Sequence, residues 1–290
     1  MTEGTLKWGV ERRLEFIEFR LYWEGGVNRS DIIERFGVSV PQASKDLTLY
    51  QERAPMNARY DKSARRYVAG EGFSPVFLRP DPDTYLIQLR QLAEGLVADG
   101  ESWLMAPPVT DVALTPRRAV DGAVLREILA ALREGRSVEV LYQSMNAARP
   151  DPVWRRISPH AFGHDGFRWH VRAWCHDSER FKDFLLPRIL KMGAQSVLGR
   201  PGEEDEMWHA MFDLAIIPHP GLSVAQQAVV ARDFSMMGGR VVLLVRKAML
   251  FYVLRRLGLL EDARFKDPHI QHIVAEDPIK TAEAWQLGQR

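Results

Sequence analysis

Apolar residues near the start of the chain recur at helical spacing. The stretch LKWGVERRLEFIEFRLYWEG places them three or four positions apart, so it predicts a helix that ends at Gly25 and Gly26. The residues expected on its inner face are Val10, Leu14, Ile17, Leu21 and Tyr22.

Two shorter helices follow in NRSDIIERFGVSVPQASKDLTLYQER. Ser30 is the expected N-cap of a helix that runs to Phe36, and Gly37 supplies a tight turn. Ser39 caps the next helix, where Pro41 stands in the first turn and its missing N–H costs nothing. The residues expected to face inward are Ile32, Ile33, Phe36, Ala43, Leu47 and Tyr50.

A short helix, a turn with glycine and a second short helix are the parts of a helix-turn-helix. Short polar and basic side chains on the solvent side of its second helix are of the kind that read base edges and phosphates. The following NARYD, DKSA and RRYV predict a basic β-hairpin, or wing, of the kind that lies along the phosphate backbone. The alternative is a three-helix bundle with a polar face and a solvated hairpin. The candidate DNA-binding residues are Ser39, Gln42, Ser44, Lys45, Thr48, Arg59, Lys62, Arg65 and Arg66.

The pattern changes after residue 75. PDTYLIQLRQLAEGLVADG predicts an amphipathic helix that ends at Gly100, and the prolines of MAPPVTDVALTP favour an extended segment. DGAVLREILAALREG predicts another helix, closed by Gly135. We expect residues 76–120 to form a structured, helical hinge between two functional domains.

Four alternating stretches then predict strands, namely SVEVLYQSM, VWRRISPHAFG, GFRWHVRAWCH and RFKDFLLPRIL. Turn residues separate them, so we expect a small antiparallel barrel or a strongly bent sheet. Side chains alternate between the two sides of a strand. Within WHVRAWCH, one face should therefore be apolar core and the other a cationic and aromatic groove. The expected core face holds Trp169, Val171, Ala173 and Cys175, and the expected groove face holds Arg168, His170, Arg172 and Trp174.

The last ninety residues predict a small α+β unit. FDLAIIPHP and GRVVLLVRK are typical of strands, and SVAQQAVVARDF and AMLFYVLRRLGLL are typical of helices. The last of these is apolar enough to be either core or interface. The whole chain is thus expected to be a multidomain α+β protein.

Composition predicts where in the cell the protein is found and which part of the chain is most basic. Hydrophobic residues make up 46% and charged residues 27% of the 290, as in an ordinary globular protein. The single cysteine, the lack of a signal-like start and the lack of a long apolar run predict a cytoplasmic protein without a membrane span. Residues 136–200 hold 11 Lys and Arg against 6 Asp and Glu, although the net charge of the chain is only +1. That local surplus predicts an anionic partner at the middle domain.

Known catalytic and metal motifs have little support. His170 and Cys175 should lie on opposite faces of their strand, and no CxxC, HxxxH or HExxH spacing is present, so we expect no metal. No serine stands in a GxSxG turn, the cysteine falls on the apolar face, and Walker or Rossmann loops are absent. We therefore expect no cofactor and no enzyme activity.

The middle stretches VEVLYQS, RRISPH, GFRWHVRAW and RFKDFLLPRI together resemble a WYL domain, a family named for a Trp-Tyr-Leu motif. The motif reads Trp169-His170-Val171 here, so two of its three residues differ. With RFGVSVPQAS and RWHVRAW, the chain looks most like the BrxR or CapW subgroup, whose members are encoded beside phage-defence systems. The resemblance implies a homodimeric regulator, usually a repressor, that binds a double-stranded operator with an inverted repeat.

The resemblance also implies a domain plan and a ligand site. The plan is a winged helix-turn-helix in 1–75, a helical linker in 76–120, a WYL ligand-sensing domain with an Sm-like barrel in 121–200, and an α+β dimerisation domain in 201–290. The implied effector is an anionic nucleotide or oligonucleotide, which arginines hold through phosphate and aromatic rings through base stacking. The implied ligand-binding residues are Tyr142, Ser144, His160, His170, Arg172 and Arg188.

Three alternatives stay open. In the first, Arg172 and Arg188 pair with Asp177, Asp183 or Glu179 on a solvated face instead of lining a ligand site. In the second, the middle domain is a nucleotide-processing enzyme. In the third, it is a module that binds single-stranded RNA or DNA.

Overall fold

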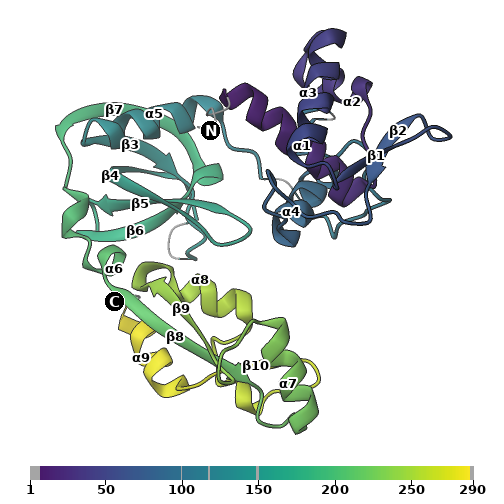
Figure 1. Cartoon of the computed structure of the whole chain (residues 1–290). Coiled ribbons are helices and arrows are strands. Elements are labelled where there is room, and N and C mark those ends of the chain that lie inside the picture. Colours follow the sequence, from purple (N-terminus) through teal and green to yellow (C-terminus); the bar gives the residue numbers. More distant parts are fainter. Residues whose placement is uncertain (1–6, 99, 117, 148–149, 288–290) are drawn as a thin grey trace. The chain divides into compact units, whose positions relative to one another are not determined.

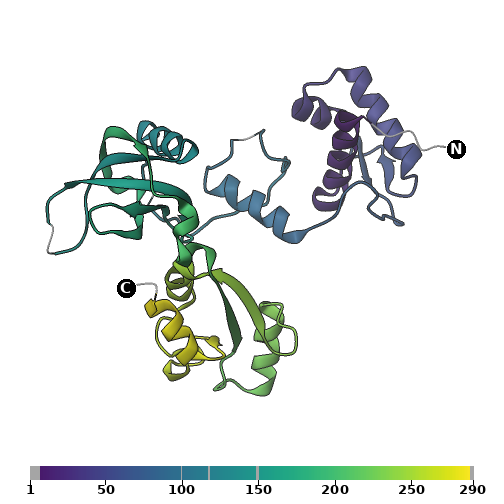
Figure 2. The same ribbon diagram turned by 90° about the vertical axis from the view of Figure 1, so that its left-hand side faces the viewer.

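The computed structural model describes residues 7–98, 100–116, 118–147 and 150–287. The chain divides into two compact units, residues 1–116 and 117–290, and each is described by itself (Figures 1 and 2). Within the described residues, no helix combines the length and the apolar character that a membrane crossing requires.

The N-terminal unit begins with a winged helix-turn-helix. Its elements are α1 (Trp8–Glu24), α2 (Arg29–Phe36), α3 (Val40–Arg53), the antiparallel strands β1 (Ala58–Asp61) and β2 (Arg66–Ala69), and α4 (Pro82–Ala93). The predicted order of three helices and a hairpin is confirmed.

The caps explain where the helices start. Asn28, rather than the predicted Ser30, caps α2, because its side chain accepts from the backbone N–H of Asp31 at 3.1 Å while the Asp31 carboxylate accepts from the Asn28 N–H at 2.9 Å. This reciprocal capping box satisfies two backbone donors, whereas a lone serine cap would satisfy one. The predicted Ser39 cap of α3 and the predicted turn at Gly37 are confirmed, and Gly37 is left-handed, at φ 62°.

The core of this unit surrounds α1. Leu14, Ile17 and Leu21 are buried as predicted, but Tyr22 is 44% exposed, so its expected place on the inner face is wrong. Phe19, which the periodicity did not single out, is buried instead. It stacks on Tyr85 of α4, with ring centroids 6.2 Å apart. The buried face of α1 therefore includes Phe19, which contacts the connector, and does not include Tyr22.

The connector is less of a hinge than we expected. Apolar side chains from Phe77 to Met105 pack on the winged-helix core, and Trp103 and Leu104 are buried. Helix α4 ends at Ala93 rather than at Gly100, because the chain turns at Gly95, which has a φ of 63°. The folded part of the connector thus belongs with the winged helix, and the described residues after Met105 in this unit have no helix or strand.

The second unit opens with a helix over an antiparallel sheet (Figure 1). The elements are α5 (Gly122–Arg133), β3 (Arg136–Tyr142), β4 (Val153–His164), β5 (Trp169–Cys175), β6 (Arg180–Leu185) and β7 (Ile189–Leu198). The strand order is β6-β5-β4-β3-β7, and α5 packs across β3, β4 and β7. Helix α5 and four of these strands were predicted.

Two expectations for this sheet need correction. RFKDFLLPRIL is two strands rather than one, because a 3-10 turn at Leu186–Arg188, which contains Pro187, ends β6 before β7 begins. The closed barrel is not confirmed, since no ladder joins β6 to β7 among the described residues. The β3–β7 ladder has register shifts, which bend a sheet without closing it.

The chain ends in a smaller α+β layer. Its elements are α6 (Glu206–His209), β8 (Met211–Pro218), α7 (Val224–Asp233), β9 (Val241–Arg246), α8 (Lys247–Leu257), β10 (Ile273–Ala275) and α9 (Pro278–Leu287). The sheet order is β10-β8-β9, so β9 is an edge strand. The predicted β8, β9, α7 and α8 are confirmed, whereas β10 and α9 were missed. Leu250 and Leu254 are fully buried, so α8 contributes to the core.

Candidate nucleic-acid interface and central polar cluster

A hollow of about 630 Å³ lies between α2, α3 and the hairpin. Its charged lining residues are all basic, namely Arg29, Arg65 and Arg66. Its polar and apolar lining residues are Asn28, Ser30, Ser44, Leu47, Thr48, Tyr60 and Tyr67. The structure thus brings together four of the predicted DNA-binding residues, Ser44, Thr48, Arg65 and Arg66.

Sequence reasoning did not assign the other six lining residues to DNA binding, among them Arg29, Ser30 and Tyr60. The signal for the first two was the Asn28 cap, because it places Arg29 and Ser30 in the exposed first turn of α2. The Arg29 Nη1 lies 3.4 Å from the Ser44 Oγ, which links α2 to the exposed side of α3.

The other predicted DNA-binding residues lie outside the hollow, and some are already engaged. The Gln42 Nε2 donates to the Asp46 Oδ1 at 2.9 Å, and Asp46 also accepts from the Arg13 Nε at 2.6 Å. Ser39 serves as the cap of α3. Lys45 on α3 and Arg59 and Lys62 on the hairpin are exposed basic side chains.

Arg66 has a structural role in addition to its place in the groove. Its Nη2 donates to the Glu24 carbonyl oxygen at 3.1 Å, at the end of α1. Its guanidinium lies so close to Gly26 that a Cβ added there would come within 2.6 Å of it. Backbone hydrogen bonds between Val27 and Tyr67 join the same two segments at 2.8 Å. The hairpin is therefore held firmly beside the helices.

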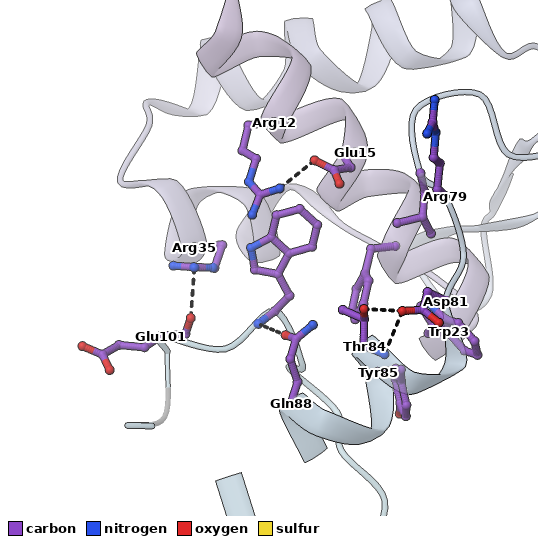
Figure 3. A pocket seen from close by; sticks show the side chains of 13 residues that line it. Arg12, Glu15, Trp23, Arg35, Arg79, Asp81, Thr84, Tyr85, Gln88 and Glu101 are labelled. Atoms are coloured by element: carbon purple, nitrogen blue, oxygen red, sulfur yellow. Dashed lines mark hydrogen bonds and ion pairs between the residues drawn. The ribbon is translucent and has the colours of Figure 1, made fainter. Parts of the chain in front are cut away.

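A second hollow, of about 430 Å³, marks the seam between the winged helix and the connector (Figure 3). Arg35 of α2 donates to the Gly100 and Glu101 carbonyl oxygens at 3.2 and 3.1 Å. The Arg12 guanidinium lies 4.0 Å from the centroid of the Trp103 ring. These contacts around the hollow hold the connector against the winged helix.

The predicted groove face of β5 is filled by the chain's own carboxylates. The Arg172 Nε and Nη2 donate to the Asp205 Oδ2 and Oδ1 at 2.7 and 3.1 Å, and the two side chains are 8% and 1% exposed. Nη1 of Arg172 also donates to the Asp183 Oδ1 at 3.3 Å, and the His160 Nε2 lies 3.0 Å from the Asp205 Oδ2. The pairing of Arg172 with Asp183 follows the alternative interpretation, but the pair is buried rather than solvated.

His170 links the sheet to α8. Its Nε2 lies 3.2 Å from the Asp165 Oδ2, and its ring centroid lies 4.6 Å from that of Tyr252. The Tyr252 hydroxyl donates to the Asp183 Oδ2 at 2.9 Å. The His170 Nδ1 is buried and has no hydrogen-bond partner in the described part of the chain. We call His160, His170, Arg172, Asp183, Asp205 and Tyr252 the central polar cluster.

Burial and hydrogen bonding oppose each other in this cluster. Burial alone would raise the pKa of Asp205, but hydrogen bonds from His160 and Arg172 outweigh it and hold that pKa well below its usual range. Burial lowers the pKa of His170, although the hydrogen bond to Asp165 partly offsets it. The aspartate is therefore ionised and the histidine neutral at pH 7.

Trp169 is not in the core, contrary to expectation. Val171, Ala173 and Cys175 are fully buried, but Trp169 is 52% exposed. As the first residue of β5 it pairs with His164 at the very end of β4, and its ring lies 4.6 Å from the His164 ring. The alternation predicts the correct side of the sheet, but the core does not extend to the first residue of the strand.

The remaining predicted ligand residues lie apart from the cluster. The Tyr142 hydroxyl accepts from the Leu185 N–H at 3.2 Å, and the Ser144 Oγ accepts from the Asn146 N–H at 3.2 Å. The Arg188 guanidinium makes no ion pair with any described residue. The described residues also contain no group of three or more His, Cys, Asp or Glu side chains that could hold a metal ion.

Three family models match successive parts of the chain. Residues 9–91 match the BrxR transcriptional regulator winged helix-turn-helix domain, and residues 123–193 match the WYL domain. Residues 211–280 match the C-terminal dimerization domain of the BrxR transcriptional regulator.

Curated relatives match nearly the whole chain. The DNA-binding transcriptional repressor CapW of Stenotrophomonas maltophilia is 42% identical over 98% of this chain and 95% of its own length. The repressors of the same name from Pseudomonas aeruginosa and Escherichia coli (strain KTE188) are both 41% identical, over 91% and 90% of this chain and 88% and 87% of their own lengths. A solved structure, proteasome accessory factor B/C (PafBC) of Arthrobacter aurescens, matches 96% of this chain and 46% of its own length at 16% identity and a TM-score of 0.31. On the evidence of these full-length relatives, the chain belongs to the CapW family of DNA-binding transcriptional repressors.

Proposed function

We propose that this chain is a homodimeric repressor whose winged helix-turn-helix binds a two-fold symmetric operator in double-stranded DNA. The observation that carries the proposal is the groove between α2, α3 and the hairpin, where the charged lining residues are three arginines. Guanidinium groups bind phosphates bidentately, and the polar residues of α3 beside them suit base edges. Lys45, Arg59 and Lys62 extend the basic surface beyond the groove.

The dimer is proposed to form through the outer face of the C-terminal sheet. Strand β9 is an edge strand, and Val242, Leu243 and Leu244 are exposed on it. Met211 of β8 is exposed too, and the β8–β9 register places it on the same face as Val242 and Leu244. A cluster of exposed apolar side chains on one face of a sheet marks a surface for packing against another chain. A second copy is the occupant we assign, because this sheet lies within the part that matches a dimerization domain.

We also propose that an anionic nucleotide or oligonucleotide controls the repressor. The genes that it regulates are proposed to be phage-defence genes, and the protein is proposed to act in the cytoplasm. The basic surplus of the middle domain supports an anionic effector. Arg172 is already held by Asp205 and Asp183, so an effector at the predicted residues would have to replace those carboxylates. Tyr142, Ser144 and Arg188 do not share this restriction.

Footprinting of the purified full-length protein on the DNA upstream of its own gene tests the function. We expect protection of an inverted repeat whose half-sites lie about one helical turn, roughly 34–36 Å, or a multiple of it, apart. Single-stranded DNA of the same sequence should bind more weakly. Equal binding to the single strand, or tight protection of a site without two-fold symmetry, would contradict the dimeric repressor.

A further inference from the structure

A series of hydrogen bonds leads from α1 to the first turn of α3. The Arg13 Nε and Nη2 on α1 donate to the Asp46 Oδ2 and Oδ1 on α3 at 2.6 and 3.2 Å. The Asp46 Oδ1 also accepts from the Gln42 Nε2 at 2.9 Å, one turn earlier on α3. We call these three side chains the Gln42 network.

The middle member of the network is fixed in place. The Asp46 side chain is 1% exposed and the Arg13 side chain is 13% exposed. Both carboxylate oxygens are held by the planar guanidinium of a neighbouring helix, and such a bidentate pair has a defined geometry. The packing of α1 against α3 therefore decides where the acceptor for Gln42 lies.

The fixed carboxylate decides which end of the Gln42 amide faces it. An amide ends in an oxygen and an NH2 group of similar size, so a half-turn about the last bond exchanges an acceptor for donors. The carboxylate of Asp46 only accepts, and a half-turn would place the Gln42 Oε1 against it. One N–H of Gln42 is therefore used inside the protein. Its second N–H and its Oε1 have no partner among the described residues.

A simpler explanation covers only part of this arrangement. Gln and Asp four residues apart on a helix form a hydrogen bond that stabilises the helix by itself. Such a pair works on an exposed surface and needs no third residue. It does not explain why Asp46 is buried, nor why Arg13 of another helix holds both of its oxygens.

The position of Gln42 on α3 is that of a base contact. It lies in the first turn, next to the Ser39 cap, and the N-terminal residues of a recognition helix are those that contact base edges. The Ser44 and Thr48 hydroxyls donate to the Val40 and Ser44 carbonyl oxygens at 3.0 and 3.1 Å, so their protons are used within α3. Gln42 offers both a free donor and a free acceptor.

From this geometry we infer that Gln42 recognises an adenine in the major groove of each operator half-site, and that Asp46 and Arg13 are positioning residues that set its amide for adenine and against guanine. Adenine presents the N7 acceptor beside the N6 donor, which match the free N–H and Oε1 of Gln42. Guanine presents two acceptors, N7 and O6, so O6 would face the Gln42 oxygen. The inference rests on the proposed function and adds to it a base and the residues that select it.

Competition binding of the full-length protein to its footprinted operator tests the base contact. Each base pair of a half-site is replaced in turn. At one adenine, we expect replacement by guanine to weaken wild-type binding at least about fivefold. The analogue 7-deazaadenine, which lacks the N7 acceptor, should weaken binding at the same position. Gln42→Ala should bind the adenine, guanine and 7-deazaadenine operators alike.

Two variants test the positioning. In Asp46→Asn the new amide can donate as well as accept, so Gln42 can take either orientation, and the preference for adenine over guanine should fall to within about twofold. Arg13→Lys keeps a cation beside Asp46 but not the fork, so its preference should lie between those of the wild type and Asp46→Asn. It decides the question if Asp46→Asn does not fold. The slope of affinity against salt should stay at the wild-type value in Arg13→Lys, since no phosphate contact is removed.

Glu52→Gln is the matched control, because Glu52 is exposed in the last turn of α3 and its replacement changes the charge of the helix as Asp46→Asn does. It should keep the full preference for adenine. A purely structural role of Asp46 would weaken binding to all sequences equally and would leave the choice of base unchanged.

Three results would overturn the inference. They are the lack of any adenine whose replacement Gln42→Ala makes neutral, a wild-type base preference in both Asp46→Asn and Arg13→Lys, and an equal loss of preference in Glu52→Gln. If Asp46→Asn alone loses the preference, Arg13 is not a positioning residue. If an inverted repeat is protected while these tests fail, the inference alone is wrong. If no inverted repeat is protected, the proposed function fails, and the assigned base contact fails with it.

Discussion

Arg172 and Asp205 form a bidentate pair, with Nε–Oδ2 and Nη2–Oδ1 distances of 2.7 and 3.1 Å, in a place almost closed to water. The pair joins β5 of the WYL sheet to the segment that leads into the C-terminal layer. Asp183 and Tyr252 extend the connection to α8. Arg172, which was predicted to lie on a ligand-binding face, therefore connects two layers of one unit through a buried ion pair.

Replacing either partner should destabilise the protein strongly. Arg172→Gln leaves Asp205 ionised and buried, and Asp205→Asn leaves the buried guanidinium with only the longer contact to Asp183 among the ion pairs of the described residues. Removing one member of a buried pair typically costs about 3–5 kcal/mol. Urea denaturation at pH 7 measures this loss, as the free energy of unfolding of the unit formed by residues 117–290.

Arg264→Gln is the control for that experiment, because its pair with Asp262 lies on the surface. Its midpoint should stay close to that of the wild type. If Arg172→Gln unfolds at the wild-type midpoint as well, Arg172 is not a structural residue and a ligand role for its guanidinium returns.

His170 should make stability depend on pH. Because burial lowers its pKa in the folded protein, the unfolded state binds more protons just below the ordinary histidine pKa of about 6.5. Stability should therefore be fully present above that pH and fall as the pH drops toward the lowered folded pKa. The charged and titratable groups around His170 are Asp165, Asp183, Arg168 and Tyr252.

Unfolding midpoints measured between pH 5 and 8 check this prediction. His170→Tyr keeps an aromatic ring against Tyr252 but removes the titration, so its curve should be flatter. Some slope should remain, since burial also lowers the pKa of His176. An unchanged slope in His170→Tyr would show that other groups cause the pH dependence.

The sequence predicts the winged helix well because local rules decide it. Helical periodicity, the Ser39 cap and the turn at Gly37 each act within a few residues, and each agrees with the structure except for the inner-face position expected for Tyr22. The hairpin likewise follows from alternation and a turn. Even the error at Ser30 is local, since Asn28 two residues earlier is the stronger cap in combination with Asp31.

The central polar cluster was beyond such rules. Alternation correctly separates His170 and Arg172 from Val171 and Ala173, but it does not say what covers either face. The cover comes from Asp205, 33 residues after Arg172 along the chain, and a pairing at that separation depends on tertiary packing. A polar face in a strand was therefore interpreted as a groove, although the folded chain fills it.

Glu18 is a second buried residue that no pattern indicated. Its carboxylate accepts from the Phe77 and Leu78 backbone N–H groups, both at 2.6 Å, and from the Tyr50 hydroxyl at 2.9 Å. Glu18→Gln places an amide N–H donor beside the N–H and hydroxyl donors that the carboxylate accepted from. The substitution should lower the free energy of unfolding by about 3 kcal/mol and release the connector. Hydrogen exchange of the backbone amides in 76–78 should rise well above that of the wild type.

Glu15→Gln, less than one turn earlier on α1, is the matched variant, because the ion pair of Glu15 with Arg12 is partly exposed to water. Exchange in 76–78 should be unaffected there. Slow exchange in Glu18→Gln would mean that the apolar contacts of Phe77 and Leu78 alone hold the connector in place.

Lys45 and Gln42 should affect DNA binding differently. Lys45 is exposed on α3, and Lys45→Ala should weaken binding to all sequences and reduce the slope of affinity against salt by about one. The inferred contact of Gln42 is with a base, so Gln42→Ala should change sequence preference and leave the salt slope unchanged. Titrations at several salt concentrations, on the operator and on single-base variants, separate the two effects. An unchanged salt slope in Lys45→Ala would remove this residue from the phosphate contacts.

The edge strand β9 gives the last prediction. Leu244 is 65% exposed and shares the outer face of the sheet with Val242 and Met211. In a dimer that buries this face, Leu244→Lys would place a charge in an apolar interface and should weaken self-association at least about tenfold, with a parallel loss of affinity for the inverted repeat. Sedimentation equilibrium over a range of concentrations measures the dimer. Val229→Lys on α7 is the control, because Val229 is similarly exposed, at 60%, but lies outside the sheet. If both variants stay dimeric, the interface lies elsewhere; if both dissociate, α7 belongs to it, and β9 is not its centre.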